Sequence, residues 1–183
     1  MEATSVQKIA RVLRALVNLL LVCNIAALPV VPPLVYYRDN PFALAAEQAL
    51  AGALPQYWLE GLSRVWSAPV TCMLALFLLF SGGCTAVILW QGRRVLDTIL
   101  KGTPFSLENA AALRRAALAS FVISGAALAR AAFSVCYYRS PAPLATYNAL
   151  FVPIFAMAGL LLLVMSALFR QAAELKAEND LTI

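Results

Sequence analysis

Hydrophobic residues in this chain gather into four long stretches, which polar segments separate. The stretches cover residues 12–36, 66–90, 116–138 and 147–169. At about 1.5 Å of rise per residue, a helix of any of these lengths crosses the ~30 Å hydrocarbon core of a bilayer. An isolated span must satisfy its backbone hydrogen bonds internally, which favours helices. The pattern therefore predicts an all-α integral membrane protein, with four transmembrane helices in one domain of residues 1–183.

Composition agrees with a membrane protein and argues against several chemistries. Hydrophobic residues make up 62% of the 183 residues and charged residues 13%, whereas soluble domains average about 45–50% and about 25%. The sequence contains no histidine, which removes the commonest general base and transition-metal ligand. It also lacks a C-x-x-C pair and paired carboxylates within the spans. We therefore expect no enzymatic activity, no metal and no cofactor.

The four cysteines lie within or beside apolar stretches, where free cysteine behaves as a small hydrophobic residue. Two of them, Cys72 and Cys136, fall near the same membrane surface. An oxidising compartment would allow them to pair. The sequence leaves open whether they do.

Lysine and arginine are distributed unequally between the two sides of the predicted bundle. Three basic residues, Arg38, Arg64 and Arg139, lie on one side. Ten lie on the other side: Lys8, Arg11, Arg14, Arg93, Arg94, Lys101, Arg114, Arg115, Arg170 and Lys176. Because short cytoplasmic segments carry the excess of basic residues, both termini are predicted to be cytoplasmic. Topology thus accounts for the basic residues, and we expect no direct binding of nucleic acid.

The outer segment of residues 38–65 is long for a structureless connection. Asn40 and Pro41 are typical of a helix start, and apolar residues then recur at helical spacing up to Ala53. We predict a short amphipathic helix on the outer membrane surface, with a lid over a substrate path as the alternative. Before this segment, the prolines at 29, 32 and 33 predict a kinked or non-helical end to the first span.

The segment of residues 92–115 predicts a helical hairpin in the cytoplasm. The helix of the second span continues to Leu100, Gly102 and Pro104 interrupt it, and Ser106 caps the next helix. Glu108 then lies favourably in the first turn of that helix. The tail, residues 170–183, extends the fourth span in the same way.

We predict that the hairpin and the tail form one docking surface, because both continue into water beyond the membrane. Acidic tail residues, Glu174 and Glu178 among them, would face the basic hairpin, with at most about 1 kcal/mol from each exposed pair. The alternative is a tail that packs on the hairpin only to complete the fold. The candidate docking residues are Phe105, Glu108, Arg114, Leu175, Leu181 and Ile183.

Arg130 is the only charged residue well inside a span. Burial of an arginine at this depth costs at least ~2.5 kcal/mol, so such a residue is a functional candidate. It either faces a ligand or anion, or extends its side chain to the outer interface as a structural residue. Asn18 and Asn24 are the candidate polar residues to join it within the membrane.

Small residues in the second and third spans predict close helix packing. They occur as Ser81-Gly82-Gly83-Cys84 and as Ala116, Ser120, Ser124, Gly125 and Ala129.

The chain resembles the small bacterial membrane proteins known as domain of unknown function 2975. The segment Leu100-Lys101-Gly102-Thr103-Pro104-Phe105-Ser106 carries the likeness, together with Glu108-Asn109, Leu113-Arg114 and the terminal Glu178-Asn179-Asp180-Leu181-Thr182-Ile183. The resemblance implies a bacterial inner-membrane location. It also implies a soluble helix-turn-helix regulator as partner. It supplies no catalytic residue.

These observations favour a regulatory or interaction protein that senses for, or anchors, such a regulator. The alternative is a small transporter or channel subunit, in which Arg130 lines an anion- or ligand-facing cavity. A homo-oligomer is compatible with either function.

Overall fold

The computed structural model of the protein describes residues 5–36 and 54–181, and the regular elements in those ranges are all helices. In chain order they are α1 Ser5–Ala27, η1 Leu28–Val30, α2 Val31–Tyr36, α4 Leu54–Arg64, α5 Pro69–Leu100, α6 Leu107–Tyr138, η2 Ala142–Ala145, η3 Tyr147–Leu150 and α7 Phe151–Leu181.

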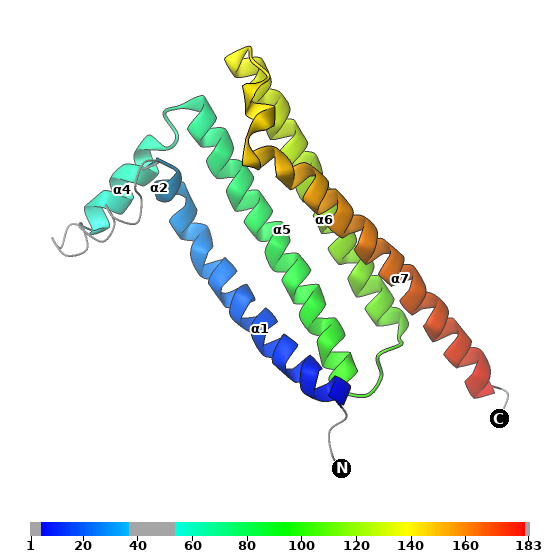
Figure 1. Ribbon diagram of the computed structural model, residues 1–183. Helices are drawn as coiled ribbons and strands as arrows, with labels where there is room; N and C mark the ends of the chain where they lie inside the picture. Colours follow the sequence, from blue (N-terminus) through cyan, green and yellow to red (C-terminus); the bar gives the residue numbers. More distant parts are fainter. Residues whose placement is uncertain (1–4, 37–53, 182–183) are drawn as a thin grey trace.

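Four of the described helices are long and apolar enough to cross a membrane: Gln7–Val30, Pro69–Leu100, Leu107–Tyr138 and Phe151–Asn179. They pack in chain order, α1 on α5, α5 on α6 and α6 on α7 (Figure 1). The predicted all-α fold with four transmembrane helices is confirmed.

The bundle has two distinct ends, which Figure 1 separates clearly. The start of α1, the connection between α5 and α6 and the end of α7 lie at one end, which we call the turn end and define by residues 100–106. At the other end, the α4 end, lie α4, η2 and η3. The four described spans therefore begin and end at the same end of the bundle, as the sequence predicts.

The first span departs from a single helix at its prolines. The helix α1 ends at Ala27, a 3₁₀ turn containing Pro29 follows, and α2 then continues to Tyr36. An interruption was predicted here, and the structure places it at the first proline, since the residues after Val30 are again α-helical.

The amphipathic helix predicted up to Ala53 lies outside the described residues. The structure instead describes α4 just beyond that position, packed on α2. A pairing of Arg64 with Glu60 at 2.8 Å marks the polar face of α4, and Leu59 and Leu62 are exposed apolar residues. The sequence signal for α4 was Pro55 in its first turn, followed by apolar residues at helical spacing.

Close packing of α6 against α7 rests on small residues. Ser124 donates a hydrogen bond to the carbonyl of Val152 (2.8 Å), and Ser166 donates one to the carbonyl of Ala110 (2.7 Å). Two hydroxyls thus contact the backbone of the facing helix. Large aliphatic side chains point outward instead; Leu161, for example, is 63% exposed. This inside-out distribution of size and polarity is the one that lipid favours.

Candidate functional site

The turn between α5 and α6 is built by local backbone chemistry. Gly102 has φ +79°, its N–H bonds the carbonyl of Ile99 (3.1 Å), and the N–H of Thr103 bonds the carbonyl of Thr98 (3.0 Å). These two bonds form a Schellman cap, which satisfies the last carbonyls of α5. Ser106 then accepts a hydrogen bond from the N–H of Asn109 (3.3 Å), as the predicted N-cap of α6.

The buried side chain of Asn109 stabilises this turn by hydrogen bonds. The sequence did not predict this role. It is 1% exposed, and its Nδ2 donates to the hydroxyl of Thr98 (2.5 Å) and to the carbonyl of Pro104 (2.7 Å). One side chain thus joins α5, the turn and α6. Its place three residues after a capping serine gave no signal of this tertiary role.

The first turn of α6 also borders a charged hollow of about 290 Å³ beneath the turn. Its charged lining residues are Arg94, Asp97, Lys101, Glu108 and Arg115. Glu108 lies in the first turn of α6, as predicted. Nearby, the Nε of Arg14 lies 2.7 Å from Asp97 Oδ1, which connects α1 to α5. Sequence reasoning assigned no role to Asp97.

The described candidate docking residues lie on the turn, on α6 and on α7. Phe105 is half exposed and its ring lies 5.7 Å from that of Phe169, so the turn contacts α7. Arg114 and Leu175 are exposed on α6 and α7. Leu181 ends α7, while Ile183 lies outside the described residues.

Beyond Phe169, the helix α7 runs past the start of α6. Ser166 is level with Ala110, and Phe169 is level with Phe105, which precedes α6. The remaining residues 170–181 extend the helix by roughly 18 Å at 1.5 Å per residue, and Figure 1 shows this end projecting from the bundle. Glu174 pairs with Arg170 of the same helix (2.8 Å). The attraction predicted between Glu174 and the hairpin is therefore replaced by a pair within α7.

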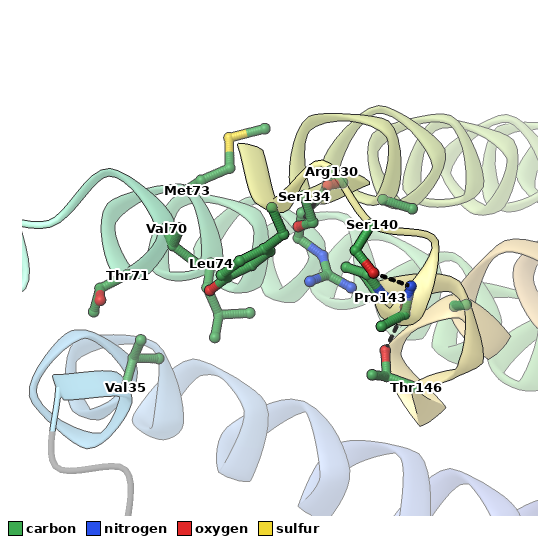
Figure 2. A pocket seen from close by; sticks show the side chains of 14 residues that line it. Val35, Val70, Thr71, Met73, Leu74, Arg130, Ser134, Ser140, Pro143 and Thr146 are labelled. Atoms are coloured by element: carbon green, nitrogen blue, oxygen red, sulfur yellow. Dashed lines mark hydrogen bonds between the residues drawn. The ribbon is translucent and has the colours of Figure 1, made fainter. Parts of the chain in front are cut away.

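Arg130 reaches into a cavity of about 510 Å³ near the α4 end (Figure 2). It is 8% exposed, and its guanidinium carbon lies 4.8 Å from the centroid of the Phe77 ring. It precedes Tyr138, the last residue of α6, by eight positions, which corresponds to a depth of about 12 Å. The lining residues are Val35, Val70, Thr71, Met73, Leu74, Arg130, Ala131, Ser134, Tyr138, Ser140, Ala142, Pro143, Thr146 and Ala149.

Several hydroxyls of the cavity form hydrogen bonds with the backbone that surrounds it. Ser134 donates to the carbonyl of Arg130 (3.0 Å), and Thr146 donates to the carbonyl of Pro143 (2.7 Å). Ser140 accepts from the N–H of Ala142 (3.3 Å), an arrangement that leaves its own O–H as a donor. Figure 2 shows Ser140 and Thr146 on the side of the cavity formed by η2.

Asn18 and Asn24 do not line this cavity. Both belong to α1, which packs on α5, and the Oδ1 of each is buried without a hydrogen-bond partner. The structure therefore does not bring the three candidate intramembrane residues together in one cavity.

All four cysteines belong to the part of the chain that the structure describes. Cys23, Cys72, Cys84 and Cys136 are free. Among the described residues, no group of three or more histidine, cysteine, aspartate or glutamate side chains could hold a metal ion.

Comparison with known proteins bears on the family of the chain. The model of the family described as "protein of unknown function (DUF2975)" matches residues 55–183, from α4 through the turn and α7 to the last residue. Searches of curated proteins and of solved structures found no match. The matched residues make up more than half of the chain, and they include the turn and the terminal segment on which the resemblance rests. The chain belongs to this family of membrane proteins.

Proposed function

We propose that this protein is a membrane-embedded regulatory protein that docks a soluble partner at its turn end. The observation that carries the proposal is the projection of α7 past the bundle. Residues 170–181 continue beyond the contact of Phe169 with Phe105, and Leu175 within them is 67% exposed. Lipid does not explain this exposure, because the sequence from Arg170 to Leu181 is mostly polar. An exposed apolar residue on a projecting polar helix can anchor a partner.

Charged residues of α5, the turn and α6 line the hollow at the same end of the bundle. Arg94, Lys101 and Arg115 line the hollow beneath the turn. Among the described residues of its lining, Asp97 and Glu108 are the acidic ones. A partner with an acidic face and an apolar anchor pocket would match this surface. The resemblance to the family suggests a soluble helix-turn-helix regulator as that partner. The proposal assigns no catalytic step to the chain.

Partner capture tests the docking surface. Leu175→Ala and deletion of residues 179–183 should each abolish recovery of a helix-turn-helix protein with the tagged chain from native membranes. Both variants should insert and unfold at the wild-type temperature, because Leu175 contributes an exposed side chain rather than packing. Cross-linking followed by mass spectrometry identifies the captured protein.

Leu144→Ala is the matched control, since Leu144 is 54% exposed at the opposite end of the bundle. It should retain the partner. If the truncated protein keeps both its stability and its partner, docking at the turn end is wrong. If truncation instead lowers the unfolding temperature, the tail completes the fold.

The proposal requires the turn end to face the cytoplasm of a bacterial inner membrane. The arrangement of the termini and the ten-to-three asymmetry of basic residues support this orientation. Cysteines introduced at Thr103 and Gln56, in a chain whose four native cysteines are alanine, should label oppositely. A membrane-impermeant maleimide added to intact cells should modify the Gln56→Cys variant and spare Thr103→Cys. Both variants should label equally after lysis; labelling of Thr103→Cys in intact cells would reverse the topology.

A small transporter or channel subunit is the second candidate function. The favouring observation is the cavity that Arg130 lines. Solute flux into liposomes that contain the purified protein distinguishes this function from docking alone.

A further inference from the structure

The charged hollow beneath the turn combines cations from two helices. Arg94 and the adjoining Lys101 come from α5 and its end, and Arg115 comes from α6; all three are exposed lining residues. In the part of the chain that the structure describes, none of the three forms an ion pair. Positive charges gathered around one hollow of about 290 Å³ focus their attraction on an anion within it.

The two carboxylates described in the lining differ in their effect on an anion. The Oδ1 of Asp97 lies 2.7 Å from the Nε of Arg14, so a cation of α1 balances the charge of Asp97. Glu108 is exposed in the first turn of α6, and its negative charge opposes an anion in the hollow. Solvent screens an exposed carboxylate, and the positive end of the α6 dipole lies at the same turn. Glu108 therefore reduces the attraction of the cations without cancelling it.

The level of the hollow in the membrane follows from Trp90. This residue is 50% exposed on α5, and the guanidinium carbon of Arg93 lies 5.4 Å from the centroid of its ring. Exposed tryptophan is typical of the headgroup level of a bilayer. At 1.5 Å per residue, Arg94 and Lys101 follow Trp90 along the chain by about 6 Å and about 16 Å. The hollow thus begins at the level where the phosphate groups of the adjoining leaflet lie.

The chemistry and size of the hollow fit a phosphate group. A guanidinium offers paired N–H donors that match two phosphate oxygens, and a lysine ammonium adds a compact charge. The volume of about 290 Å³ is close to the lower limit of the range of about 300–1,000 Å³ that ligand pockets occupy. A phosphate with a small polar headgroup fits such a space, while the acyl chains of a lipid would remain in the bilayer.

We infer that the charged hollow is a binding site for a phosphate group, which Arg94, Lys101 and Arg115 contact. The phosphate can belong to an anionic lipid headgroup or to a soluble phosphate ester, since both present the same oxygens to these side chains. The inference does not depend on the docking proposal, which rests on the projecting residues 170–181 of α7.

Radiolabelled phosphatidylglycerol in mixed micelles with a neutral detergent is a suitable probe. Phosphatidylcholine with the same acyl chains is the matched lipid, because it carries the same phosphate together with a compensating choline cation. Binding of phosphatidylglycerol to the purified full-length protein should be saturable and at least about tenfold tighter than that of phosphatidylcholine. Equal affinities for the two lipids overturn the site.

Arg115→Gln should lower the affinity for phosphatidylglycerol by about tenfold, and Arg115→Lys by less, because lysine keeps the charge but not the paired donors. Arg93→Gln is the matched control. It removes the same charge from α5 beside Arg94 but outside the lining, and it should alter the affinity by less than about twofold. A diffuse basic surface predicts equal losses in both variants, so equal weakening overturns the site.

Two further variants test the location of the phosphate. Glu108→Gln should tighten binding, by up to about fivefold, because it removes the opposing charge from the lining. Ala111→Leu should weaken binding, because it fills space in the hollow without changing a charge. Both residues are exposed, so both variants should fold. Weaker binding by Glu108→Gln overturns the site. Should Arg115→Gln unfold, unchanged binding by Ala111→Leu overturns it instead.

Competition identifies the source of the phosphate. Glycerol phosphate that displaces radiolabelled phosphatidylglycerol from the wild-type protein points to a soluble phosphate ester. Displacement by unlabelled phosphatidylglycerol but not by glycerol phosphate points to an anionic lipid of the adjoining leaflet. Either result supports the site when Arg115→Gln weakens the binding that is displaced, and wild-type affinity in a folded Arg115→Gln variant overturns it.

Discussion

Replacement of Asn109 by alanine is expected to destabilise the protein strongly. The substitution removes both donors from a side chain that is 1% exposed, and it leaves the Pro104 carbonyl and the Thr98 hydroxyl without the hydrogen bonds from Nδ2. Loss of one partner of a buried hydrogen bond costs about 1–3 kcal/mol. With two bonds and a small cavity involved, we expect a loss of about 3 kcal/mol in the free energy of unfolding.

The unfolding temperature in a neutral detergent, followed by circular dichroism, measures this effect. Glu108→Ala is the control, because this exposed neighbouring residue contributes through the helix dipole and through solvent-screened charges, each at most about 1 kcal/mol. Asn109→Asp is a stricter test. It keeps the size of the side chain but replaces the donating amide with an acceptor, so it should resemble Asn109→Ala. An Asn109→Ala protein that unfolds with the wild type would show that the Schellman cap and Ser106 alone hold the turn.

The turn illustrates which parts of this fold are predictable from the sequence. Gly102, Pro104 and Ser106 act through local backbone chemistry, and so their pattern correctly predicted the end of α5 and the start of α6. The amide of Asn109 reaches Thr98 on another helix, eleven residues earlier. No local periodicity encodes such a contact. It exists only once the two helices are folded against each other.

The same distinction applies to the intramembrane site. The sequence identifies Arg130 as costly to bury, because a charge within an apolar span is unusual without any structural knowledge. The cavity depends in addition on the short irregular connection after α6, which contains Ser140 and, within η2, Pro143. The path of such a connection follows from tertiary contacts, so the sequence could not place these residues beside Arg130. Asn18 and Asn24 lie on α1, which packs on α5, whereas Arg130 lies on α6. The sequence did not predict this order of packing, so it offered no reason to separate the asparagines from Arg130.

Small residues were predicted to bring helices together, and the structure distinguishes those that do so from those that do not. Ser124 reaches the backbone of α7, whereas its neighbour Gly125 is exposed and an added Cβ there would meet nothing within 4 Å. Gly159, to which sequence reasoning assigned no packing role, is buried against α6. A helix with small residues on several faces has no sequence signal that identifies the packed face. The assignment depends on which neighbour is present.

Gly159→Leu is accordingly expected to separate α6 from α7 locally. A Cβ at this position would lie 2.9 Å from Phe121 Cε1 and 3.0 Å from both Cδ1 and Cζ, so even alanine requires the ring to shift. Leucine adds three more carbon atoms in the same direction. Overpacking of this kind typically costs about 1–3 kcal/mol, and a loss within this range is expected.

Gly125→Leu makes the same chemical change on α6 where space is open. It should leave the unfolding temperature unchanged or raise it, because glycine is a poor helix former and leucine a good one. The comparison of the two variants therefore isolates contact with Phe121 from helix propensity, which favours leucine in both. Gly159→Leu combined with Phe121→Ala should recover part of the lost stability, since removal of the ring makes room for the new side chain. If Gly159→Leu unfolds at or above the temperature of Gly125→Leu, the close approach of α7 to Phe121 does not contribute to the stability of the bundle.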